Sequence, residues 1–192
     1  MQAGNQRPVV VAVIGSPRRK GNTAALVDSA LEELERNGCS CSRIVLSDKR
    51  INACDGHTNC GERDCPHDDD MAGVIEQVYA ADGLILGTPV YFENVSGQMK
   101  VFIDRTATAY YHEQWLAPKV VGLIAVAAES DSGDTLAALQ RFVALSNPEE
   151  VPTVTLGALA ADPGDAAKDE TLMAEARALG SAMAEKLGLD PS

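Results

Sequence analysis

A run of apolar, mostly β-branched residues, Val9 to Ile14, is followed at once by a loop between two glycines and then by an amphipathic segment. An apolar run without polar alternation is typical of a strand buried on both faces, as in parallel sheets. The loop, Gly15-Ser-Pro-Arg-Arg-Lys-Gly-Asn-Thr23, therefore joins the end of a strand to the start of a helix. Backbone amides converge at such a junction, and the helix dipole favours an anion there. The sequence predicts that this loop binds a phosphate group.

The candidate ligands of that phosphate are Ser16, Arg18, Gly21, Asn22 and Thr23. Hydroxyl groups donate single hydrogen bonds, whereas the guanidinium of Arg18 can form two parallel bonds to phosphate oxygens. The loop has neither the G-x-G-x-x-G pattern of dinucleotide sites nor the G-x-x-x-x-G-K-[ST] pattern of nucleoside triphosphate sites. A terminal monophosphate is therefore favoured. The alternative is an ordinary turn between a strand and a helix, with Thr23 as the cap.

Strand-like and helix-like segments alternate along the chain. The expected strands are Val9–Ile14, Ser42–Leu46, Gly83–Gly87, Lys119–Ala128 and Pro152–Leu156, and the expected helices are Thr23–Asn37, Met71–Ala80, Ser96–Tyr110, Asp134–Ala144 and Asp169–Leu187. This alternation predicts an α/β fold in which helices cover both faces of a parallel sheet. We expect a single domain over residues 1–192, with an inserted cysteine-containing loop at residues 47–70.

The composition argues against several classes of function. Sixteen Lys and Arg against twenty-eight Asp and Glu give a net charge of −12, which disfavours nucleic acid and anionic membranes as partners. The chain has neither an apolar run of membrane-spanning length nor an apolar signal-peptide core at its start. Five cysteines do not resemble a secreted disulfide framework. We therefore expect a cytoplasmic protein.

A second loop, which follows the third expected strand, has the composition of a contact for a flat ring. Its candidate cofactor contacts are Pro89, Val90, Tyr91, Phe92 and Asn94. In parallel sheets, ligands bind beyond the carboxyl ends of the strands, where this loop and the phosphate loop both lie. The alternative is that the two aromatic residues pack in the core.

The loop after the fourth expected strand has a different character, because residues 127–134 include three acids and a single glycine. We expect these acids to stay solvated and to oppose the approach of nucleotide phosphates by charge repulsion. Asp104 and Arg105 are expected to make a structural ion pair or a helix-end contact rather than to take part in chemistry.

Three cysteines and one histidine lie close together in the inserted loop, at Cys54, His57, Cys60 and Cys65. Cysteine thiolates are the usual ligands of a 4Fe–4S cluster, and histidine replaces thiolate at iron in some centres. Three interpretations stay open: a cluster held by three thiolates and one imidazole, a tetrahedral zinc site, and a metal-free loop with free thiols or one reversible disulfide.

The chain resembles the NADPH-dependent FMN reductases and iron–sulfur flavoproteins in Gly15–Arg18 with Gly21–Thr23, in Gly87–Phe92, and in Val95–Lys100 with Phe102–Arg105. The resemblance implies a flavodoxin-like fold with a five-stranded parallel sheet of order 2-1-3-4-5. It also implies FMN as the cofactor, electron transfer as the activity, and assembly into a homodimer or homotetramer. Those proteins carry a compact cysteine motif at the position of the inserted loop, and here His57 stands in place of the second cysteine.

These features lead us to expect an FMN-dependent oxidoreductase that passes electrons from NAD(P)H, or from an electron-carrier protein, to a small-molecule or protein acceptor. Flavin performs the redox step, so no side chain is nominated as a catalytic acid or base. A cluster in the inserted loop would add a ferredoxin-like electron donor. The alternative is a flavodoxin-like carrier or binding module without turnover, because the fold alone does not separate the two.

Overall fold

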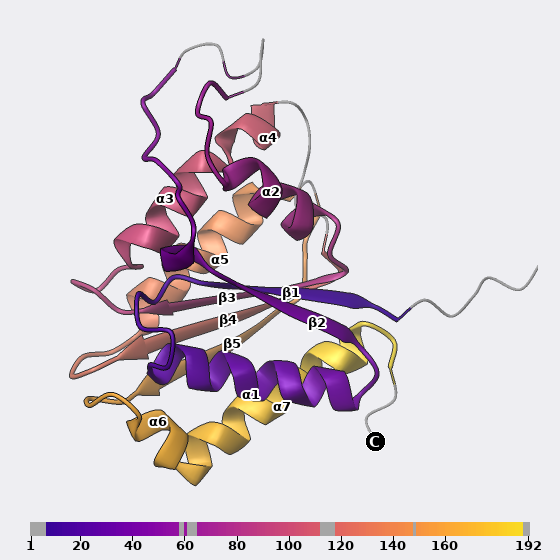
Figure 1. Ribbon diagram of the computed structural model, residues 1–192. Helices are drawn as coiled ribbons and strands as arrows, with labels where there is room; N and C mark the ends of the chain where they lie inside the picture. Colours follow the sequence, from indigo (N-terminus) through magenta and orange to yellow (C-terminus); the bar gives the residue numbers. More distant parts are fainter. Residues whose placement is uncertain (1–6, 58–59, 61–64, 112–117, 148, 190–192) are drawn as a thin grey trace, which may run out of the picture.

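The chain forms one sheet of five parallel strands, which lies at the centre of the molecule (Figure 1). The computed structural model describes residues 7–57, 60, 65–111, 118–147 and 149–189. The strands are β1 (Val9–Ile14), β2 (Ser40–Val45), β3 (Gly83–Pro89), β4 (Val120–Ala127) and β5 (Thr153–Leu159). Their order in the sheet is β2-β1-β3-β4-β5, with every neighbouring pair parallel. The predicted fold class and strand order are confirmed.

Helices cover both faces of this sheet, as the alternating sequence pattern predicts (Figure 1). α1 (Asn22–Arg36) and α7 (Glu170–Lys186) pack together on one face, and the short α6 (Asp165–Lys168) precedes α7. α2 (Met71–Tyr79), α3 (Gly97–Arg105) and α5 (Gly133–Leu145) cover the other face. None of the helices in the described part of the chain has the length and apolar character that crossing a membrane requires.

The central strands are buried on both faces, which explains their unbroken apolar sequences. All eight residues of β4 are buried, and β1 is buried from Val10 onward. Alternate residues of β1 enter two separate cores, with Ile14 among the side chains that meet α1 and α7, and Val13 among those that meet α2, α3 and α5. In the edge strand β5, by contrast, buried and exposed residues alternate toward its end.

The structure differs from the sequence prediction at several element boundaries. The predicted helix Ser96–Tyr110 is divided at Thr106 into α3 and α4 (Ala107–Tyr111). The hydroxyl of Thr106 donates to the carbonyl of Ile103 at 2.7 Å, a local bond that competes with helix continuation. β5 runs three residues beyond its predicted end, and a short 3₁₀ turn, η1 (Leu46–Asp48), opens the inserted loop.

Candidate functional site

A narrow cleft of about 80 Å³ lies where β1, β3 and β4 end. Its lining residues are Ser16, Arg18, Gly21, Asn22, Thr23, Pro89, Val90, Tyr91, Val126, Ala128, Ala160 and Ala161. The first eight of these are also eight of the ten residues that the sequence nominates for the cofactor. The fold thus brings the phosphate loop and the ring loop together at one edge of the sheet, as the parallel topology requires.

Ser96 holds these two loops against each other. Its hydroxyl donates to the carbonyl of Gly15 at 2.6 Å and accepts from the backbone N–H of Met99, so that it also caps α3. Its own N–H donates to the hydroxyl of Thr88 at 3.0 Å. A Cβ atom at position 15 would lie 2.8 Å from the Met99 Cβ atom, so the close approach of α3 requires glycine there. The loops are therefore fixed by the fold before any ligand arrives.

The first turn of α1 is suited to an anion. The N-cap residue, Gly21, offers no side chain to accept from the backbone N–H groups at the start of the helix, and no acidic residue lies in the first turn. Uncapped N–H groups and the helix dipole both favour a bound anion at this point. The hydroxyl of Ser16 accepts from the N–H of Arg18 at 3.2 Å, which shapes the loop around the same spot.

The side chain of Asn22 has a different role from the direct phosphate contact that the sequence suggests. Its amide nitrogen donates to the carbonyls of Ala160 and Asp162, and its amide oxygen accepts from the N–H groups of Gly164 and Ala166. These four bonds use the hydrogen-bonding capacity of the amide and tie the loop after β5 to the start of α1. Asn22 still lines the cleft, and as the first residue of α1 its backbone N–H has no acceptor within the helix.

The ring loop makes a tight turn whose two central residues, Phe92 and Glu93, have φ angles of 51° and 59°. Tyr91 and Asn94 flank them and exchange backbone hydrogen bonds at 2.9 and 3.1 Å. Positive φ at two successive residues is typical of a type I′ turn, and this backbone conformation is strained for residues other than glycine and asparagine. The turn leaves Phe92 fully exposed at its tip, while Tyr91 lines the cleft.

Two of the ten nominated residues are therefore absent from the cleft lining, namely Phe92 at the tip of the turn and Asn94 at its base. The side chain of Asn94 accepts from the N–H of Val95 at 2.8 Å, and so it stabilises the turn itself. The sequence suggests a shared role for Tyr91 and Phe92, but the tight turn places Tyr91 at the cleft and leaves Phe92 exposed to solvent.

Sequence reasoning missed four cleft residues: Val126, Ala128, Ala160 and Ala161. The signal was a small residue directly after each of two strands, where a ligand needs room near the backbone. The predicted strand ends at Leu156, which places Ala160 inside a loop. In the structure β5 ends at Leu159, so that Ala160 follows the strand directly. The acids of the loop after β4, including Glu129 and Asp131, are exposed, as expected.

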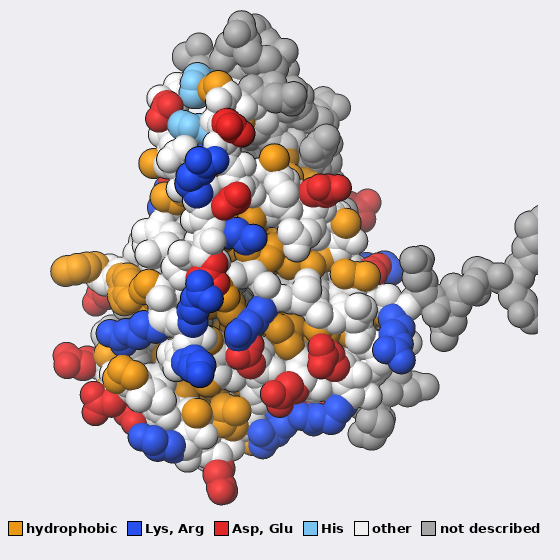
Figure 2. All heavy atoms as spheres, viewed as in Figure 1, with side chains coloured by type: hydrophobic (Ala, Val, Ile, Leu, Met, Phe, Trp, Pro, Cys, Tyr) orange, Lys and Arg blue, Asp and Glu red, His pale blue; other side chains and the backbone are white. Residues whose placement is uncertain are grey.

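Lys and Arg side chains gather on the face shown in Figure 2, which carries α1, β2 and η1, although the chain is acidic as a whole. Arg19 pairs with Asp48 at 2.8 Å, and Arg43 pairs with Asp28. Because Arg19 is already neutralised by a carboxylate, Arg18 is the better cation for a phosphate in the cleft.

The four predicted metal ligands lie in the inserted loop without a common centre. Cys54 is exposed, and its sulfur accepts from the N–H of Gly56. The thiol of Cys60 donates to the carbonyl of His57 at 3.6 Å, and Cys65 is partly buried. Among the residues that the structure describes, no group of three or more His, Cys, Asp or Glu side chains is arranged to hold a metal ion. This arrangement does not fit a cluster or zinc, so we derive no step through either group.

Arg105 closes the base of the inserted loop. Its Nη1 atom donates to Asp69 Oδ2 at 2.7 Å and to the carbonyl of Asn52 at 2.8 Å, and its Nη2 atom donates to Asp69 Oδ1 at 3.1 Å. The hydrogen bond from Arg105 is the main cause that holds the pKa of Asp69 well below its usual range. The predicted structural role of Arg105 is thus observed with Asp69 as the partner, while Asp104 pairs with Lys100.

The two cysteines outside the inserted loop lie at the start of β2: Cys39 directly precedes the strand, and Cys41 belongs to it. Cys39 and Cys41 are free thiols whose pKa values are raised chiefly by burial, that of Cys41 to about 12. The sequence also places His112 and Trp115 after the third expected helix, in a region expected to cover the flavin of a neighbouring subunit, and both lie outside the described residues.

Comparison with known proteins gives a consistent result. The family model described as NADPH-dependent FMN reductase matches residues 8–161 of this chain. An iron–sulfur flavoprotein of Methanocaldococcus jannaschii is 36% identical over 94% of this chain and 97% of its own length.

Solved structures show the same fold at low sequence identity. An NAD(P)H:quinone oxidoreductase from Methanothermobacter marburgensis superposes with a TM-score of 0.71 at 19% identity, covering 93% of this chain and 98% of that one. A flavodoxin from the domain Archaea superposes with a TM-score of 0.62 at 13% identity, covering 94% and 99%. Likeness at these identities bears on the fold alone.

Proposed function

The chain belongs to the NADPH-dependent FMN reductase family, and from this membership we propose that it is an FMN-dependent oxidoreductase that takes hydride from NAD(P)H and reduces a small, flat acceptor such as a quinone or free flavin. The observation that carries the proposal is the cleft in which Ser16, Arg18 and Thr23 of the phosphate loop lie together with Pro89 and Tyr91 of the ring loop.

The residues of the cleft fit the two ends of FMN differently. A hollow of about 80 Å³ accommodates little more than the phosphate end, which the N–H groups at the start of α1 and the guanidinium of Arg18 would hold. The ring would then lie at the rim formed by Pro89, Val90 and Tyr91. A ring held at the rim stays accessible to flat substrates, which supports small-molecule acceptors.

When bound, FMN supplies the chemistry, because it accepts a hydride and passes the electrons on. The protein's part is to bind and orient it. Ser96 keeps the phosphate loop and the ring loop in register, and the satisfied amide of Asn22 keeps the loop after β5 against α1. No side chain of the cleft is assigned proton transfer.

The donor and the assembly state are further parts of this proposal. NAD(P)H is proposed as the donor on the strength of the family, and a ferredoxin-like donor would require a cluster in the inserted loop. We also propose a homodimer or homotetramer, supported by exposed aromatic residues such as Phe92, Tyr91 and Tyr111. Size-exclusion chromatography with light scattering tests the assembly, and a monomer at micromolar concentration would contradict it.

A steady-state assay tests the activity and separates it from a carrier without turnover. Purified protein with added FMN should oxidise NADH or NADPH in the presence of a soluble quinone, at a rate proportional to the protein. The Thr23→Val variant, which removes one cleft hydroxyl, should lower the rate at limiting FMN and recover at excess FMN. Protein that takes up FMN but shows no turnover with either nucleotide would favour a carrier.

A further inference from the structure

Phe92 is fully exposed at the tip of the ring loop, and its backbone is strained there. Both Phe92 and Glu93 have φ angles in the left-handed region, which residues with a Cβ atom seldom adopt. The tip is nevertheless fixed in place, because Tyr91 and Asn94 exchange backbone hydrogen bonds at its base. A large aromatic side chain that is held out into solvent on a strained turn is typical of an interaction surface.

A hollow of about 480 Å³ lies between η1 and the start of α3. These two elements lie side by side (Figure 1). We call it the η1–α3 hollow, and its lining includes the apolar residues Leu46, Ile51 and Val101 and the polar residues Ser47 and Lys49. It shares no lining residue with the cofactor cleft, so its occupant would not compete with FMN.

The tip and the hollow carry opposite charges. Glu93 is exposed next to Phe92, and Lys49 is exposed in the lining of the hollow. Among the residues that the structure describes, neither of these two side chains forms an ion pair. An aromatic ring followed by a carboxylate therefore complements an apolar hollow that contains a lysine.

The tip and the hollow lie near each other on the surface, because Gly97 lines the hollow and follows Phe92 by only a few residues. Phe92 does not enter the hollow of its own chain, since it is fully exposed. When one surface carries both a projecting group and a matching hollow, a two-fold axis lets each copy fill the hollow of the other.

The overall charge of the chain also favours this surface for contact between two copies. Two chains with a net charge of −12 repel each other. Lys and Arg side chains gather on the face that carries η1 (Figure 2), so contact beside η1 reduces that repulsion.

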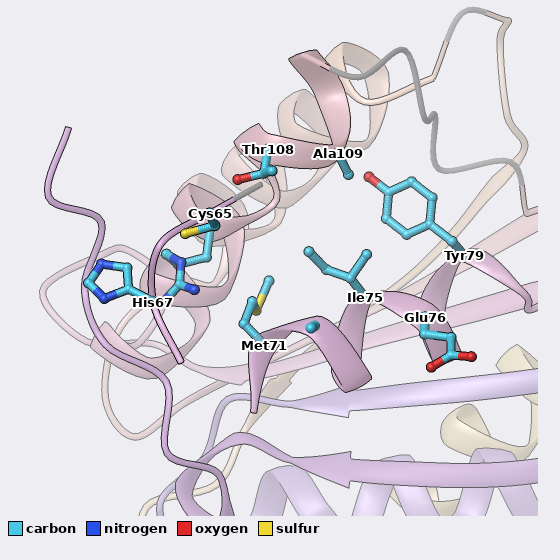
Figure 3. Close-up of a pocket in the computed structure, with 10 residues that line it drawn as sticks. Cys65, His67, Met71, Ile75, Glu76, Tyr79, Thr108 and Ala109 are labelled. Carbon is cyan, nitrogen blue, oxygen red and sulfur yellow. The ribbon is translucent and has the colours of Figure 1, made fainter. Parts of the chain in front are cut away.

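A larger hollow, of about 680 Å³, lies between α2, α4 and the segment from Cys65 to His67 (Figure 3). It matches the tip less well for two reasons. Its lining includes Arg105, so it lies at the far end of α3, about 14 Å along a helix of nine residues. Its lining also includes Glu76, a carboxylate that would repel Glu93.

We propose that two copies of this chain assemble with Phe92 of each copy in the η1–α3 hollow of the other, and with Glu93 of each copy paired with Lys49 of the other. The inference rests on the homo-oligomer of the proposed function and assigns the contact that forms it. Because Tyr91 belongs to the same turn and lines the cleft, this contact would also hold the ring loop at the cofactor.

Sedimentation velocity over a range of protein concentrations, with excess FMN present, tests the contact. Phe92→Ser should raise the dimer Kd about tenfold or more, since buried aromatic residues carry much of the binding energy of an interface. Leu145→Ser removes another exposed apolar side chain, at the end of α5, and should change the Kd little. A monomeric wild type would contradict the assembly and this contact together, whereas a wild-type oligomer that withstands Phe92→Ser would overturn the contact alone.

Charge reversal tests the ion pair by the same measurement. Glu93→Lys and Lys49→Glu should each weaken the dimer, because like charges then face each other, and the two substitutions in one chain should restore it. Lys186→Glu, at the exposed end of α7, is the matched control and should change the Kd little. A double variant that dimerises no better than the two single variants would overturn the pairing.

Two tryptophan variants identify which hollow the partner occupies. Ser47 is exposed in the lining of the η1–α3 hollow, and Ala72 is exposed in the lining of the larger one. Ser47→Trp should weaken the dimer and Ala72→Trp should leave it intact, with circular dichroism to show that both variants fold. The reverse result would place the partner in the larger hollow and would overturn the assignment.

Discussion

Arg105 and Asp69 form an ion pair whose side chains are only 3% and 1% exposed. Arg105 is the last residue of α3, and Asp69 lies in the segment that leads into α2. Arg105 also donates to the carbonyl of Asn52, so the same side chain holds the first part of the inserted loop. At the opposite end of α3, Ser96 is bonded to Gly15 of the phosphate loop. One helix of nine residues, about 14 Å long, therefore connects the base of the cysteine-containing loop with the cofactor cleft.

Replacing Asp69 by Asn should destabilise the protein strongly, because it leaves the guanidinium of Arg105 buried without its counter-charge. Removal of one partner from a buried ion pair typically costs about 3–5 kcal/mol. Urea denaturation at pH 7 measures the change. The matched control is Asp104→Asn, which breaks the exposed pair with Lys100 and should cost less than about 1 kcal/mol. Equal effects of the two substitutions would contradict the role of the buried pair.

The same pair predicts a pH dependence of stability. Arg105 lowers the pKa of Asp69 in the folded protein, so the carboxylate stays charged at pH values where the unfolded chain binds a proton. The stabilisation is fully present above the ordinary aspartate pKa of 3.8 and is lost as the pH falls toward the lower folded value. Wild type should thus lose more stability than Asp69→Asn between neutral pH and about pH 3. Parallel curves for the two proteins would refute this.

Ser96→Ala should affect both stability and cofactor binding. The substitution removes the cap of α3 and the bond to Gly15, and loss of such a cap typically costs about 1 kcal/mol. FMN affinity should fall at the same time, because the phosphate loop loses the hydrogen bond that holds Gly15 against α3. Ser146→Ala, at the end of α5, is the control and should leave FMN affinity unchanged. Fluorescence titration with FMN measures both variants, and unchanged affinity in Ser96→Ala would remove the proposed link.

Arg18 and Arg19 are adjacent, but we predict that only Arg18 matters for FMN. A charge-assisted hydrogen bond contributes about 1.5–3 kcal/mol, so Arg18→Ala should raise the Kd for FMN roughly 10- to 100-fold. Arg19→Ala should change it little, because that side chain is 71% exposed and pairs with Asp48. Riboflavin, which lacks the phosphate, should bind wild type and Arg18→Ala equally. A similar loss of riboflavin affinity would show that Arg18 acts elsewhere.

His57→Cys should increase the capacity of the inserted loop for iron. In the described part of the chain, the wild-type residues are not arranged to hold a metal ion, and the substitution supplies the fourth thiolate that a 4Fe–4S cluster usually takes, so that binding of iron and sulfide can gather the loop around it. After anaerobic reconstitution with iron and sulfide, the variant should retain more iron and sulfide per chain than the wild type. Ser47→Cys, in η1 at the start of the loop, controls for the addition of a thiol. Equal iron content in wild type and His57→Cys would show that position 57 is not a ligand position.

The fold was predictable because its central strands are apolar without interruption and its helices begin and end at recognisable residues. Val10 to Ile14 and Val120 to Ala127 are buried on both faces, and sequences of this kind suit few other environments. The helix boundary that was predicted wrongly depends on competition between side-chain and backbone hydrogen bonds. Thr106 ends α3 by bonding back to Ile103, and the sequence does not reveal which bond prevails.

The cleft residues were predictable where a loop follows a strand directly. They were less predictable where contacts with distant segments determine what a side chain binds. Asn22 has the chemistry of a phosphate ligand, but its amide is used by the loop after β5, 138 residues or more away. Arg105 was expected in an ion pair, yet the sequence holds 28 acids and does not identify Asp69 among them. Such pairings are set by packing between distant segments rather than by local pattern.

Anaerobic titration of the FMN-loaded protein with NADH and NADPH, followed by visible absorption, tests the central claim most directly. We predict that the purified chain takes up one FMN, and that its flavin bands bleach on addition of one equivalent of at least one of the two nucleotides and return when a quinone is added. Protein that stays colourless after incubation with FMN, or bound flavin that neither nucleotide bleaches, would contradict the account.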